Sequence, residues 1–194
     1  ANALAEHQLL VTRSPIRSAR YKYRELGAKF LAIEHQLAVR QKITDTKAET
    51  LYDLFVATRG ASPRIAATEM QAYQVLAQQT LDRMVSVFND DDRLLASIGT
   101  VVVYYIAFRQ PTFANAVDRD KLAEFEQLRR KAAEMVENNP TYGRPANARL
   151  REYNVFVQST NDGRALARRA EILATFVAGY AHGDPLAGLD RIAD

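Results

Sequence analysis

The segment from Arg20 to Gly60 constrains the fold most, because it specifies two consecutive helices. In its first half, apolar residues recur at spacings of four, three and four, at Leu26, Phe30, Ile33 and Leu37. This is the helical period, and a continuous apolar stripe must be buried against another element. In the second half, Thr46 precedes Glu49 by three residues, a capping-box pattern that predicts a helix start, and Gly60 is a stop signal. The segment therefore predicts a helical hairpin.

Further helices are predicted along the rest of the chain. Ser62 and Pro63 indicate the start of a third helix that reaches Phe88. The apolar run 93–109 is rich in β-branched and aromatic residues and in isolation could be a buried strand, but its length and the following Pro111 favour a central helix. We predict three more helices over 118–137, 146–158 and 162–183. The expected fold class is all-α, a six- to seven-helix orthogonal or bundle-like array.

One domain is expected, because 194 residues with 47% hydrophobic content can bury a sizeable core. We predict an N-terminal lead-in over 1–18, a single helical domain over 19–183 and a peripheral C-terminal tail over 184–194. The chain has no cysteine, which excludes disulfides and thiolate metal sites and fits a cytoplasmic location. Its longest apolar stretch, 98–108, is far shorter than the ~20 residues that span a bilayer, so we expect no membrane partner.

The residues offer no recognisable catalytic constellation. The three histidines, His7, His35 and His182, are far apart and have no ligands at metal-like spacing. Glycine-rich phosphate loops and the Gly-x-Ser-x-Gly elbow are absent. We therefore expect no catalytic residue, no metal site and no cofactor. An enzyme with an unfamiliar helical active site stays open as the weakest alternative.

Basic side chains are the strongest binding signal, although the net charge is only +3. A basic strip with interleaved tyrosines lies at the start of the first predicted helix, and a second group lies in the last third of the chain, from Arg144 to Arg169. Arginine and lysine contact phosphates, and tyrosine stacks on bases. The predicted nucleic-acid-binding residues are Arg17, Arg20, Lys22, Arg24, Lys29, Arg164 and Arg168. Charges on the solvent face of amphipathic helices would explain the same pattern without any ligand.

Three segments carry a family resemblance: 20–33 (RYKYRELGAKFLAI), 72–88 and 159–172 (STNDGRALARRAEI). Their order resembles the helical C-terminal half of GmrSD-type restriction proteins, whose N-terminal half has a ParB-like nucleotide-hydrolysing fold. The resemblance implies a helical accessory or regulatory domain of a bacterial antiviral defence system. The chain would be either part of a larger protein with that N-terminal domain or a stand-alone relative. The family's Asp-Gly-Gln-Gln-Arg motif and its HNH nuclease residues do not occur here, so no catalytic residue is carried over.

A function of a different class is the alternative to this expectation. The chain would then be a protein-interaction or self-association module without affinity for nucleic acid, whose helix faces dock a partner or an identical copy. A continuous basic groove would favour contacts with a DNA or RNA backbone, whereas an exposed apolar patch would favour the interaction module.

Overall fold

The computed structural model describes residues 1–16 and 19–192, and only the backbone of residues 19 and 20. The predicted all-α class is confirmed, because the described residues form helices and no strand, with more elements than expected. The elements, in chain order, are α1 Asn2–Ala5, η1 Leu9–Arg13, α2 Ala19–Arg40, α3 Ala48–Ala57, α4 Ala67–Val85, η2 Arg93–Leu95, α5 Ile98–Phe108, α6 Pro111–Ala116, α7 Arg119–Glu134, α8 Pro145–Phe156, α9 Gly163–Gly179, η3 Tyr180–His182 and α10 Pro185–Asp190. None of the described helices is long and apolar enough to cross a membrane.

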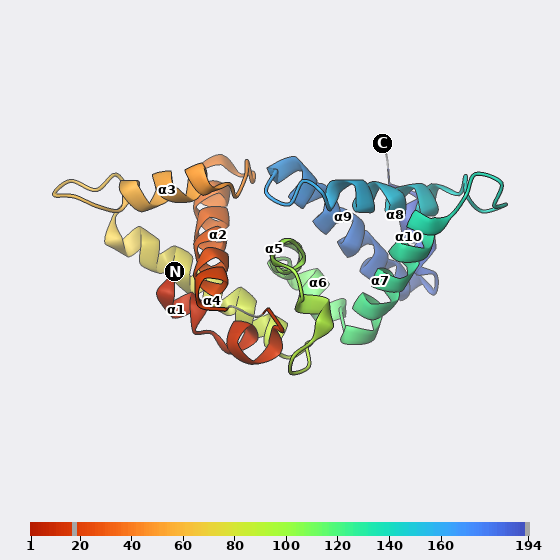
Figure 1. Cartoon of the computed structure of the whole chain (residues 1–194), viewed down its shortest axis with the longest axis horizontal. Coiled ribbons are helices and arrows are strands. Elements are labelled where there is room, and N and C mark those ends of the chain that lie inside the picture. The colour runs from red at the N-terminus through yellow and green to blue at the C-terminus, as the bar shows by residue number, and fades with distance from the viewer. Residues whose placement is uncertain (17–18, 193–194) are drawn as a thin grey trace.

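The helices form two lobes that share a central helix (Figure 1). The first lobe comprises α1–α4 and the second α7–α10. Helix α5 lies between them and is seen along its axis in this view. It packs against α2 and α4 on one side and against α9 on the other. The molecule therefore has one continuous core centred on α5.

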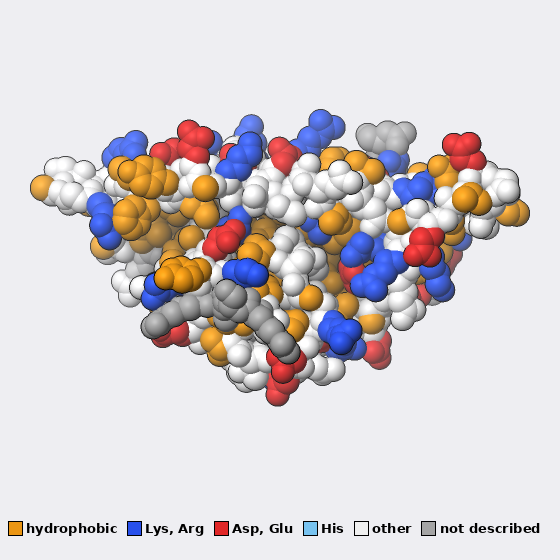
Figure 2. All heavy atoms as spheres, viewed as in Figure 1, with side chains coloured by type: hydrophobic (Ala, Val, Ile, Leu, Met, Phe, Trp, Pro, Cys, Tyr) orange, Lys and Arg blue, Asp and Glu red, His pale blue; other side chains and the backbone are white. Residues whose placement is uncertain are grey.

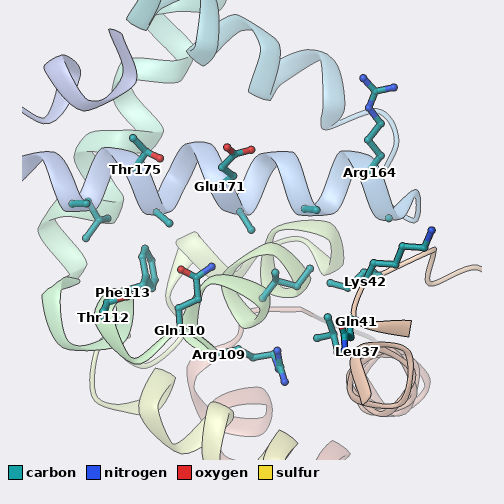
Figure 3. Close-up of a pocket in the computed structure, with 18 of the residues that line it drawn as sticks. Leu37, Gln41, Lys42, Arg109, Gln110, Thr112, Phe113, Arg164, Glu171 and Thr175 are labelled. Atoms are coloured by element: carbon teal, nitrogen blue, oxygen red, sulfur yellow. The ribbon is translucent and has the colours of Figure 1, made fainter. Parts of the chain in front are cut away.

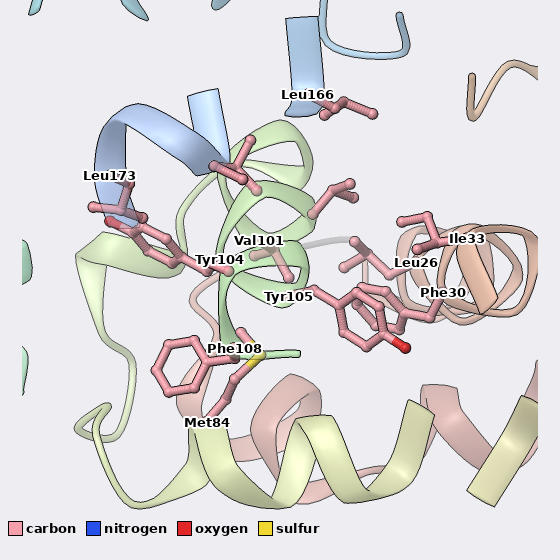
Figure 4. Packing of buried hydrophobic residues seen from close by; sticks show 14 of the residues in the cluster. Leu26, Phe30, Ile33, Met84, Val101, Tyr104, Tyr105, Phe108, Leu166 and Leu173 are labelled. Carbon is pink, nitrogen blue, oxygen red and sulfur yellow. The ribbon is translucent and has the colours of Figure 1, made fainter. Parts of the chain in front are cut away.

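Helix α5 can occupy this position because nearly its whole circumference is apolar. Tyr105 stacks on Phe30 of α2, with ring centroids 4.3 Å apart, and both side chains are buried (Figure 4). The predicted burial of Leu26, Phe30 and Ile33 is confirmed. The predicted helix 93–109 is divided, because Ser97 caps α5 by accepting a hydrogen bond from Thr100 N (3.1 Å), and residues 93–95 form η2 separately.

Two predicted helix starts are wrong. The Thr46 hydroxyl does not cap α3. It is fully buried and donates to Asn161 Oδ1 at 3.3 Å, while Asp45 accepts the N–H of Lys47 at 3.0 Å. Helix α4 begins at Ala67 instead of Ser62, and Glu69 accepts the preceding backbone N–H at 2.9 Å. In both cases a carboxylate accepts the backbone N–H of the residue that directly precedes the helix.

The two ends of the chain are less peripheral than predicted. Leu4, Leu9 and Leu10 are buried, and they bring α1 and η1 onto α2 and α4. At the other end, α10 packs against α8 and α9 with Leu189 fully buried. Both segments add apolar surface to the core, because each forms a short helix with one apolar side.

Candidate functional site

Lys29, one of the predicted nucleic-acid-binding residues, is buried inside the protein. Only 2% of the residue is exposed. Its ammonium group donates to Thr46 O (2.9 Å) and to Asn161 Oδ1 (2.7 Å), and Glu25 Oε1 lies at 3.3 Å. Lys29 follows Leu26 by three residues and precedes Ile33 by four, so it shares their buried face. Its hydrogen bond to Asn161, in the loop before α9, links α2 to the second lobe.

The rest of the basic strip is only partly accessible. Lys22 and Arg24 are exposed, as is Tyr21, whereas Tyr23 is buried and donates to Ser14 O at 3.3 Å. Arg17 lies outside the described residues, and so does the side chain of Arg20, which belongs to the first turn of α2. Among the described residues of this strip, the exposed side chains are therefore those of Tyr21, Lys22 and Arg24.

The second basic group is dispersed into internal ion pairs. Arg168 is largely buried and binds Glu152 Oε1 (2.8 Å) and Glu171 Oε2 (3.0 Å). Arg144 pairs with Asp190, and Arg149 with Glu152. Arg164, at the start of α9, is exposed and forms no ion pair with a described residue. Figure 2 shows basic and acidic side chains intermixed on the visible face, without a continuous basic surface.

An open groove of about 1040 Å³ runs along one side of α9. Helices α5 and α6 and the C-terminal end of α2 form its opposite side (Figure 3). Most of its lining is apolar or small. The apolar lining includes Leu37, Ile43, Ile106, Phe113 and Val177, and α9 contributes Ala167, Ala170, Ala174 and Ala178.

Cations lie at one end of this groove. Lys42 and Arg164 extend from the same end, and Thr112 and Phe113 lie at the other (Figure 3). Lys42 is exposed and, like Arg164, forms no ion pair with a described residue. Two acidic residues line the groove. The Asp162 carboxylate already accepts the N–H of Ala165 at 2.9 Å as the α9 cap, and the Glu171 carboxylate accepts a hydrogen bond from Arg168 at 3.0 Å.

A buried carboxylate fixes the position of a third cation, Arg109, in the groove lining. Glu34 on α2 is 1% exposed and accepts two hydrogen bonds from Arg109, at 2.7 and 3.0 Å, and one from Tyr105 OH at 2.5 Å. Burial, followed by the charge of Glu34, raises the pKa of Tyr105 well above its ordinary value, so Tyr105 stays a donor. This network ties α2 to α5 beneath the groove.

A smaller polar pocket of about 630 Å³ lies between α2, α3 and α4. It is lined by His35, Asp53, Arg64 and Glu69 among others. Burial, with the charge of Arg40, lowers the pKa of His35 below its ordinary value, so the imidazole is neutral at neutral pH. A neutral imidazole can accept a proton, but the His35 ring packs edge-on against Tyr73, and its buried Nδ1 has no hydrogen-bond partner among the described residues. The described residues also hold no cluster of metal-ligating side chains.

The sequence singled out the cations near the groove only in part. Arg164 was among the predicted binding residues, whereas Lys42 and Arg109 were not. No local signal identifies them, because the groove forms only when α9 and the end of α2 meet. No family model, curated protein or solved structure matches this chain. Its function must therefore be argued from its geometry.

Proposed function

We propose that this chain is a protein-interaction module that binds a helix of a partner protein in the groove beside α9. The observation that carries the proposal is the alanine-lined side of α9. Solvent-facing helix sides usually carry charged and polar residues, yet Ala167, Ala174 and Ala178 are wholly or partly exposed there. Small side chains let a second helix approach closely, and such grooves accept amphipathic helices.

The dimensions of the groove fit a short helix. Ala167 and Ala178 are eleven residues apart, so the alanine-lined side extends for about 16 Å, or three helical turns. The partner's apolar side would face Ile106, Phe113 and Val177. Acidic residues at one end of the partner helix would lie beside Lys42 and Arg164, whose charges no described carboxylate neutralises by an ion pair.

Selection from a displayed library of helical peptides tests this proposal. Peptides that bind the wild-type chain are expected to lose at least ~10-fold in affinity to Ala167→Trp, because an indole ring would fill part of the groove. The matched control is Ala133→Trp, which changes an exposed alanine on α7 outside the groove and should leave binding intact. If no selected peptide distinguishes the two variants, the groove is not a helix-binding site.

A second candidate function is contact with a nucleic-acid backbone by an accessory domain of a defence protein. It is motivated by the family resemblance and by four exposed cations: Lys22, Arg24, Lys42 and Arg164. Fluorescence anisotropy with duplex and single-stranded DNA tests it, because genuine phosphate contacts weaken steeply with added salt. Two double charge reversals would locate the contact by their loss of DNA affinity. One changes the end of the groove, Lys42→Glu with Arg164→Glu, and the other changes the start of α2, Lys22→Glu with Arg24→Glu. Absence of binding at low salt would eliminate this function and leave the interaction module.

A further inference from the structure

Arg169 of α9 is a buried cation that no carboxylate of a described residue neutralises by an ion pair. The residue is 1% exposed. Its one hydrogen bond within the described chain runs from Nη2 to Tyr153 OH and is long, at 3.4 Å. Nε and Nη1 are buried and have no acceptor there. A guanidinium cannot lose its proton in a protein, so its burial requires other compensation.

The neighbouring charges do not supply that compensation. The Tyr153 ring has two guanidinium groups close to it, with Arg169 Cζ 4.8 Å and Arg129 Cζ 5.4 Å from its centroid. Of the neighbouring carboxylates, Glu126 is held by Arg129 through two hydrogen bonds, of 2.9 and 2.5 Å. The aromatic ring stabilises a cation only modestly. The surroundings of Tyr153 therefore carry one positive charge more than the described carboxylates neutralise.

The unpaired nitrogen Nη1 of Arg169 lies beside the first turn of α5. A Cβ built on Gly99 would be 3.8 Å from Nη1 and 3.0 Å from Thr160 Cγ2. Gly99 is buried at the second position of α5, where a backbone N–H has no helical acceptor, and the Ser97 hydroxyl is already bonded to Thr100 N. The start of a helix is itself electropositive. Two positive groups thus meet in a buried location.

We infer that a small inorganic anion of the chloride class binds between the Arg169 guanidinium and the first turn of α5. The anion accepts hydrogen bonds from the free N–H groups of Arg169 and from the start of the helix, the arrangement by which helix N-termini hold anions. It neutralises the charge that the interior otherwise leaves unmatched. It also ties α5 to α9 and so stabilises the centre of the molecule.

Thermal unfolding in sodium chloride, compared with sodium gluconate at the same ionic strength, tests this site. Gluconate is too large to enter a buried site. Raising chloride from 1 to 100 mM is expected to raise Tm by about 5 °C, because a ligand of the native state alone stabilises that state by mass action. Arg169→Met should abolish the chloride dependence, while Arg83→Met, which changes an exposed arginine on α4, should retain it. Equal Tm values in both salts would overturn the inference.

Crystals grown in sodium bromide give a second measurement that does not depend on the folding of a variant. An anomalous bromide peak within hydrogen-bond distance of Arg169 Nη1 or Nε would support the site. A water molecule there, or bromide on the surface only, would contradict it. The result of this experiment is independent of the proposed helix-binding function, because Arg169 does not line the groove beside α9.

Discussion

At the scale of single residues, Lys29 and Phe30 are neighbours in α2 that both point into the protein and stabilise it differently. Phe30 is fully buried and stacks on Tyr105 of the central helix. Lys29 donates to one backbone and one side-chain oxygen of segments that lie 17 and 132 positions away along the chain. The first contact is apolar packing, and the second satisfies buried polar groups.

Replacing Lys29 by methionine should destabilise the protein, because Thr46 O and Asn161 Oδ1 would lose their donor inside the protein. We expect a loss of about 2–3 kcal/mol in the free energy of unfolding. Lys22→Met, at an exposed position of the same helix, should change it by less than ~0.5 kcal/mol. Chemical denaturation of both variants measures the difference. Equal effects would mean that the contacts of Lys29 add nothing to stability.

Phe30→Ala removes the aromatic stacking between Phe30 of α2 and Tyr105 of α5. Loss of transfer free energy together with the cavity left behind should cost ~3–5 kcal/mol. Differential scanning calorimetry should show a clearly lower Tm than for wild type. Phe30→Leu is the control, since it retains most of the buried volume and should cost distinctly less. An unchanged Tm in Phe30→Ala would argue against the observed orientation of α2.

At the scale of elements, the contact between the loop before α3 and the start of α9 joins the two lobes directly. Gly163 N donates to Thr44 O at 3.0 Å, and Thr46 N donates to Asn161 O at 2.9 Å. A Cβ built on Gly163 would lie 2.2 Å from Ile43 O, a separation that real atoms do not reach. The backbones can approach this closely because position 163 has no side chain.

Gly163→Ala should therefore push the loop away from α9, with a loss of several kcal/mol in stability. The matched control is Gly143→Ala, where an added Cβ would meet no atom within 4 Å and the backbone is not in a left-handed conformation. Urea denaturation monitored by circular dichroism compares the two. If both alanine variants had wild-type midpoints, the close approach at Gly163 would be incorrect.

At the scale of the whole molecule, carboxylates bound to arginines across element boundaries control the response to acid. Burial disfavours the charged form of Asp92, but hydrogen bonds from Arg119 and from two backbone N–H groups outweigh it and lower the pKa of this carboxyl. The pKa of Glu152 is lowered in the same way by Arg168 and Arg149, against burial. Asp190, bound by Arg144, also has a lowered pKa.

The pKa values of these carboxyl groups are lower in the folded than in the unfolded state. Their contribution to folding stability is therefore fully present when the pH is above the pKa of the unfolded state. This contribution is lost as the pH falls through the pKa of the folded state. We expect Tm to be nearly constant from pH 7 to about 5 and to fall steeply below about pH 4. Asp92→Asn should lower Tm at pH 7 and make the decrease below pH 5 shallower. A Tm profile of the same shape for both proteins would show that Asp92 does not contribute to acid unfolding.

The sequence by itself determined the helical class, the buried side of α2 and the starts of α7 and α9. These features depend on residues three or four positions apart: the apolar period around Phe30, and the caps Asp118 and Asp162, which accept backbone N–H groups of Lys121 and Ala165. The same period also placed Lys29 beside Leu26 and Ile33, but its charge suggested exposure. Such features can be predicted from a sequence because the two interacting residues lie within one helical turn of each other.

Only the tertiary structure decided the partners of the charged residues and the position of the groove. Lys29 is buried because Asn161, 132 positions away, supplies an acceptor for its ammonium group. Arg168, a predicted binding residue, instead donates to Glu152, which lies 16 positions away on another helix. Lys42 and Arg164 lie at one end of the groove because the loop before α3 meets α9. A charged side chain is buried when a distant residue completes its hydrogen bonds, and only the packing of helices brings that residue within reach.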